Sequence, residues 1–188
     1  MEQQLERAFD RSILLCRETA QGLNWDEAVK LLRLWEYTGR VRRGYFIEGL
    51  SGMQFIRESD FAGVMQALDQ PEDEIVWLSA VDPMQPWGKY LPHIPERPFM
   101  NLPGTAVALQ KGMPIAVFER QGKTLRVFDN VPLPDALHIV AQDYAVRRIF
   151  PALPRITLKE YPPEAGEALQ RAGFKREMQD FVLYRGYQ

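Results

Sequence analysis

Three arginines stand within four positions of a 188-residue chain whose formal net charge is −2. Arg40, Arg42 and Arg43 are followed by Tyr45 and a phenylalanine, in the stretch GRVRRGYF. Guanidinium groups bind phosphates through charge and paired hydrogen bonds, and an aromatic ring can stack on an unpaired base. This spacing predicts a local nucleic-acid contact on a protein that is not basic overall. A solvated surface ribbon with no ligand is the alternative.

The arginines follow residues 25–38, whose apolar residues recur on one face as in an amphipathic helix. Asn24 suits the N-cap of this helix, and Gly39 suits its C-terminal end. The polar face places three further candidates about one turn apart, where they can reach phosphates and bases along a groove. These candidate nucleic-acid-binding residues are Lys30, Arg33 and Tyr37.

The neighbouring segments complete a recognisable order. Residues 2–21 show apolar spacing near that of a helix, residues 40–56 predict a two-stranded ribbon, and residues 59–69 predict a short helix. A helix–turn–helix followed at once by a β-ribbon is the winged-helix pattern, with 25–38 in the recognition position and 40–56 as the wing. Winged helices also serve as rigid spacers and protein contacts.

A polar, acidic stretch at 70–74 predicts a boundary between one domain, residues 1–70, and a second, residues 75–188. Beyond it, six apolar segments predict strands of a mostly antiparallel sheet, and residues 136–150 and 162–174 predict two helices. The proline-rich stretch 82–104 predicts a long, stiff loop. The fold class that follows is α+β.

One cysteine and two distant histidines exclude a disulfide framework and a Cys/His zinc site. No apolar run approaches the roughly 20 residues that a membrane span needs, and the N-terminus lacks a signal-peptide pattern. We therefore expect a cytoplasmic protein with no metal and no membrane partner.

Asp82 is a weak catalytic candidate, because it ends a predicted buried strand and precedes a proline in VDPMQPWG. A carboxylate there could serve a base-excising enzyme, which also needs an aromatic pocket for a flipped base. The sequence shows no second carboxylate or histidine at a known spacing, so the favoured interpretation is structural. In it, the Asp82 carboxylate caps the turn through the amides of residues 84–85.

Four stretches, in order and spanning nearly the whole chain, resemble the region that follows the motor in Lhr-type (large helicase-related) superfamily 2 ATP-dependent DNA helicases. They are DRSILLCRETA, EAVKLLRLWEYTGRVRRGYFIEGLSGMQF, SAVDPMQPWG and ALQRAGFKREMQDFVLYRG. The resemblance implies a winged helix followed by a β-barrel-like, DEAD/H-associated domain packed behind the motor. It also implies a role in DNA repair and, as partners, single-stranded DNA or a DNA/RNA hybrid.

The chain departs from the whole helicase in one respect. It contains no G-x-x-x-x-G-K-[ST] loop and no DExH-type box, so no ATP hydrolysis is expected of it and no cofactor is assigned to it. ATP and Mg²⁺ would belong to a parent helicase, whose motor domains would act in cis or in trans. The leading hypothesis is a non-catalytic module that grips single-stranded nucleic acid behind that motor. The alternatives are a glycosylase-like enzyme that uses the barrel, and a purely structural module for docking or oligomerisation.

Overall fold

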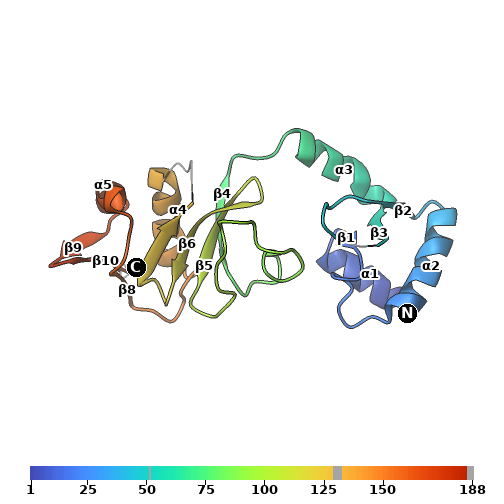
Figure 1. Cartoon of the computed structure of the whole chain (residues 1–188), viewed down its shortest axis with the longest axis horizontal. Helices are drawn as coiled ribbons and strands as arrows, with labels where there is room; N and C mark the ends of the chain where they lie inside the picture. Colours follow the sequence, from blue (N-terminus) through green and yellow to red (C-terminus); the bar gives the residue numbers. More distant parts are fainter. Residues whose placement is uncertain (51, 129–132, 186–188) are drawn as a thin grey trace. The chain divides into compact units, whose positions relative to one another are not determined.

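The computed structural model describes residues 1–50, 52–128 and 133–185. Contacts divide the chain into two compact units, Met1–Pro71 and Glu72–Gln188. Figure 1 colours the first unit blue to green and the second green to red. The sequence predicted a boundary at 70–74, and the assignment of residues 1–70 and 75–188 to two domains stays a prediction.

The first unit has the winged-helix arrangement. A three-stranded antiparallel sheet in the order β1-β3-β2 is combined with three helices. Leu5, Phe9, Leu32, Trp35 and Phe55 bring two of the helices and the sheet into one buried cluster. The elements are α1 (Glu2–Arg11), β1 (Leu14–Leu15), α2 (Trp25–Tyr37), β2 (Val41–Gly44), β3 (Gln54–Arg57) and α3 (Glu58–Asp69).

The predicted helix over 2–21 is wrong beyond Arg11. Ser12 takes an extended conformation, with φ −146° and ψ 112°, and ends α1. Leu14 and Leu15 then pair with Ile56 and Phe55 as the edge strand β1. Their apolar side chains fit a helical pattern equally well, and only the distant partner strand decides between helix and strand.

The prediction of a helix at 25–38 is confirmed, with both of its end signals. The Asn24 side chain accepts a hydrogen bond from the Glu27 amide at 3.4 Å. Gly39 has φ +74°, and the amides after the helix turn back to the carbonyls of Glu36 and Trp35. A side chain at Gly39 would strain this left-handed turn, so the glycine fixes where the chain leaves α2 for β2.

The second unit contains two antiparallel sheets, in the orders β4-β5-β6-β7 and β8-β10-β9. A single buried cluster joins both sheets to α4 and α5. Trp77 donates from Nε1 to the carbonyl of Ala136 at 2.9 Å, which ties β4 to α4 beside it (Figure 1). The elements are β4 (Ile75–Ser79), β5 (Ala106–Gln110), β6 (Met113–Glu119), β7 (Thr124–Val127), α4 (Leu133–Ala145), β8 (Arg155–Leu158), η1 (Pro163–Ala165), α5 (Gly166–Arg171), β9 (Lys175–Glu177) and β10 (Asp180–Tyr184).

The α+β class is confirmed, but the expected barrel-like closure is not formed. Among the described strands, β4 and β7 remain the two edges of an open four-stranded sheet. An isolated parallel bridge joins Thr124 at the start of β7 to Glu160, two residues after the end of β8. The fully exposed strand β9 was not predicted, because KRE shows no alternation of apolar and polar residues. No helix in the described part of the chain is long and apolar enough to cross a membrane.

Candidate nucleic-acid interface

The outward face of α2 carries the three predicted helix candidates. Lys30, Arg33 and Tyr37 are exposed, and 90% of Tyr37 is accessible. The opposite face is held in the core by Ala28 and Leu32, which are both fully buried. Within the described residues, neither Lys30 nor Arg33 forms an ion pair. Both cations can therefore bind a polyanion without first breaking an ion pair.

Acidic residues limit this surface at one end. Asp26 and Glu27 occupy the first turn of α2, where they complement the positive end of the helix dipole. The cationic part of the face is thus the middle and the C-terminal half of the helix. A phosphate chain is expected to run there and to avoid the first turn.

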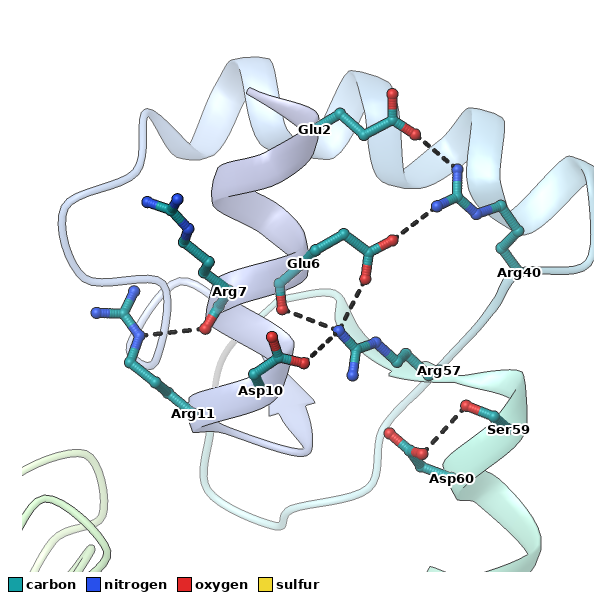
Figure 2. Close-up of polar contacts among 9 residues, drawn as sticks. All are labelled: Glu2, Glu6, Arg7, Asp10, Arg11, Arg40, Arg57, Ser59 and Asp60. Carbon is teal, nitrogen blue, oxygen red and sulfur yellow. Dashed lines mark hydrogen bonds and ion pairs between the residues drawn. The ribbon is translucent and has the colours of Figure 1, made fainter.

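Arg40 does not join this face, because it binds α1. Its guanidinium donates to Glu2 at 2.8 Å and to Glu6 at 2.7 Å, and lies 3.9 Å from the centre of the Trp35 ring. The hydrogen bond to Glu2 raises the pKa of Arg40 above its ordinary value. Figure 2 shows Glu6 between this arginine and Arg57, so one carboxylate serves two cations.

Arg57 is the second cation of this cluster, and sequence reasoning missed it. Its Nη2 donates to the carboxylates of Glu6 at 2.7 Å and Asp10 at 2.8 Å, and to the Glu6 carbonyl at 2.9 Å (Figure 2). The side chain is 23% exposed. The sequence did carry a signal for this cation. Acidic residues recur four residues apart on the predicted helix 2–21, and such a row can pair with a basic side chain. The cluster fastens α1 to the end of β3.

Arg42 binds the start of α3. It makes a two-pronged ion pair with both carboxylate oxygens of Glu58, and its guanidinium lies 4.2 Å from the centre of the Phe61 ring. This hydrogen bonding lowers the pKa of Glu58 and raises the pKa of Arg42. Arg42 thereby joins the wing strand to the helix that follows it.

Arg43 points toward α2 instead. Its Nε lies 3.2 Å from a carboxylate oxygen of Glu36, and Nη1 contacts the Met53 sulfur at 3.9 Å. Neighbouring residues of a strand point to opposite sides, which separates Arg42 from Arg43. Arg40, Arg42 and Arg43 therefore do not share one face of the ribbon, and their contact with nucleic acid stays a prediction. They reach three different helices, and each is paired with an acid.

Tyr45 is the remaining predicted residue, and it follows β2 at the start of the wing. It is 86% exposed, comparable to Tyr37. The structure therefore keeps four of the seven candidates open to a ligand and gives three an internal ion pair. The open residues are Lys30, Arg33, Tyr37 and Tyr45.

Asp82 caps its turn through one of the two predicted amides, since the Gln85 amide donates to the Asp82 backbone carbonyl at 3.1 Å instead. Its Oδ1 accepts a hydrogen bond from the Met84 amide at 2.9 Å, and its backbone carbonyl accepts one from the Lys89 ammonium group. The carboxylate thus closes a turn of the proline-rich loop. Among the described residues, no group of three or more His, Cys, Asp or Glu side chains is placed to hold a metal ion.

Comparisons with known proteins identify the region. A family model described as "Large helicase-related protein, winged-helix domain" matches residues 1–75. The chain is a C-terminal Lhr-type region. It is 34% identical over 160 residues to an Escherichia coli protein named "Lhr helicase/uracil glycosylase", which covers 76% of this chain. It is 36% identical over 111 residues to a Mycolicibacterium smegmatis protein named "Lhr helicase/ probable uracil glycosylase", which covers 53% of this chain.

The Lhr-type relatives are far longer than this chain. The matches span 10% of the Escherichia coli protein and 7% of the mycobacterial protein. The chain is thus similar to an accessory part of those helicases. The activities in their names belong to the whole proteins.

Proposed function

We propose that this Lhr-type region is a non-catalytic accessory module that holds single-stranded nucleic acid behind the motor of a helicase. The observation that carries the proposal is the outward face of α2, where Lys30, Arg33 and Tyr37 are exposed and both cations lack an ion pair among the described residues. In this proposal both cations contact phosphates, and phosphate contacts carry no sequence information, so binding is independent of sequence. The strand is DNA or one strand of a DNA/RNA hybrid.

The partner in this proposal is a pair of motor domains, in cis or in trans, that bind ATP and Mg²⁺. This chain has no phosphate-binding loop of the type such motors use. The three wing arginines take a structural role, since each already holds a helix of the first unit through a carboxylate. In this role Arg40 joins the ribbon to α1, Arg42 joins it to α3 and Arg43 joins it to α2.

The test is the salt dependence of binding to a fluorescent oligothymidine. Changing Lys30→Ala together with Arg33→Ala should weaken binding and lower the slope of log K against log salt by about 1.4, the effect of two phosphate contacts on a single strand. The matched control is Lys123→Ala with Arg155→Ala, which removes the same charge from exposed positions of the second unit. An unchanged slope in the α2 variant, or an equal fall in the control, contradicts the proposal.

A docking role is the second candidate, and α3 favours it. Phe61, Val64, Met65 and Leu68 recur at helical spacing along one side, yet no described residue of α3 is buried. Such an apolar stripe suits packing against another protein surface. Binding of the motor domains by a chain with no affinity for oligonucleotides at low salt would favour this role over the first.

A glycosylase-like activity is the third candidate, and only the names of the relatives favour it. The Asp82 carboxylate accepts a hydrogen bond from the Met84 amide, which supports its role as a turn cap. Incubation with a uracil-containing oligonucleotide, followed by detection of abasic sites, decides this question. A catalytic role can be assigned to Asp82 only if Asp82→Asn abolishes any such activity.

A further inference from the structure

The wing is built around one buried polar side chain, Gln54. This glutamine at the start of β3 is 0% exposed. Its Oε1 accepts from the amides of Phe46 and Ile47, both at 2.8 Å, and its Nε2 donates to the carbonyls of Ile47 at 3.0 Å and Leu50 at 3.5 Å. Burying an amide is unfavourable unless its hydrogen bonds are made, and here both ends are used. Gln54 therefore fixes the backbone of the wing in place of a strand partner.

The segment of the wing that follows β2 is fixed by close packing. A side chain at Gly44 would put its Cβ 2.9 Å from the Phe46 ring, so that ring lies directly over the glycine. The Phe46 ring also meets the edge of Phe61 on α3, with ring centres 6.3 Å apart. Since Gly44 and Phe46 are both held, the backbone of the residue between them is held as well.

That residue is Tyr45, and it points away from the core. It is 86% exposed, while its neighbours are only partly exposed. Arg42 and Phe46 both contact Phe61, which places them on the α3 side of the ribbon. Arg43 contacts Glu36 of α2, on the other side. By the alternation of an extended segment, Tyr45 follows Arg43 toward α2.

A rigidly held backbone that presents an exposed aromatic ring is prepared for binding. Ordering a flexible loop opposes association, and a loop fixed in advance avoids most of that loss. The tyrosine ring offers a flat apolar face, which fits the face of an unpaired base and not the edge of a stacked pair. The cations of α2 supply phosphate contacts but cannot tell a single strand from a duplex.

We propose that Tyr45 stacks on an unpaired base of the bound strand, and that Gln54 is the positioning residue that holds Tyr45 for this contact. The inference rests on the proposed function and specifies its substrate as a strand with exposed bases. Gln54 touches no ligand itself. It acts through the amides of Phe46 and Ile47.

The experiment uses the full chain and two oligothymidines, one intact and one with abasic sites. Tyr45→Ser should weaken binding of the intact strand about ten-fold, within the range for one base stacked on an aromatic ring, and should leave binding of the abasic strand unchanged. Tyr45→Phe should restore the affinity. The salt slope should not change in either variant, because no charge is removed. Equal weakening on both strands, or none on either, overturns the stacking contact.

The role of Gln54 is tested with Gln54→Met, which keeps the length of the side chain and removes the four hydrogen bonds that its amide makes to described residues. It should lose the same base-dependent part of the affinity as Tyr45→Ser and keep the salt slope. If this variant does not fold, amide exchange of Phe46 and Ile47 in the unchanged chain replaces it. Both amides should be protected, and exchange as fast as in an unstructured loop overturns the assignment.

These outcomes separate the two proposals. A chain that binds no oligothymidine at low salt overturns both of them. A chain that binds with a salt slope dependent on Lys30 and Arg33, but equally well to intact and abasic strands, overturns only the stacking contact.

Discussion

Arg42 and Glu58 illustrate how the surface charges of the first unit are used. Arg42 occupies both oxygens of Glu58 at the first residue of α3. The sequence showed three neighbouring arginines, and the structure directs them to three different helices. The partners of these arginines could not be predicted, because Glu2, Glu36 and Glu58 come from three helices that only the folded chain brings to the ribbon.

The Arg42–Glu58 ion pair should make the stability of the fold depend on pH. The pKa of Glu58 lies below its ordinary value of 4.5 because Arg42 donates hydrogen bonds to the ionised carboxylate. A lowered pKa in the folded state means that Glu58 stabilises the fold above pH 4.5 and loses this effect as the pH falls through the lowered pKa. Glu58→Gln should therefore lower the unfolding midpoint in urea at pH 7, and the difference from the unchanged chain should shrink toward pH 3.

The matched control for this prediction is Glu48→Gln, at an exposed position of the same unit with no ion pair among the described residues. It should show a much smaller difference at every pH. A difference for Glu58→Gln that persists unchanged at pH 3 contradicts the assignment of the stabilisation to the ionised pair.

At the scale of elements, the sequence predicted those boundaries that depend on residues close together in the chain. The ends of α2 follow from Asn24 and Gly39, and both act within a few residues. The strand at Leu14 and Leu15 could not be predicted in this way, because its partner residues lie some forty positions away in the chain. The Gln54 contacts were missed for a related reason. A glutamine in a strand gives no sign that the loop before it will fold back onto its side chain.

Two hairpin glycines of the second unit offer a matched pair for testing the packing between its sheets. Gly112 and Gly122 have φ of +77° and +79°, so alanine at either is strained by about 1–2 kcal/mol. Open space surrounds a Cβ at Gly112, but one at Gly122 would lie 2.7 Å from Cγ2 of the fully buried Ile156. Gly122→Ala should therefore be the more destabilising change, by about 1–3 kcal/mol for overpacking. Equal losses in urea unfolding would show that the two sheets do not pack as closely as described.

At the scale of the whole molecule, the chain combines a winged helix with an open-sheet α+β unit and carries a net charge of −2. The α+β class and the order of the elements other than β1 and β9 could be predicted from periodicity and turn residues. Periodicity could not predict whether the barrel closes. Closure depends on whether the edge strands pair with each other, and the pattern within each strand does not determine this. An overall acidic chain repels a polyanion, so binding must be confined to a local surface.

The most direct measurement is a map of backbone amide shifts in the full chain as unlabelled oligothymidine is added. We expect the largest shifts on residues 30–38, in and directly after α2, and on the residues around Tyr45. Small shifts are expected at Glu2, Glu6 and Glu58, whose arginine partners stay in place. Shifts centred on the second unit, or on α1 and its ion pairs, would contradict the claim that the outward face of α2 holds the strand.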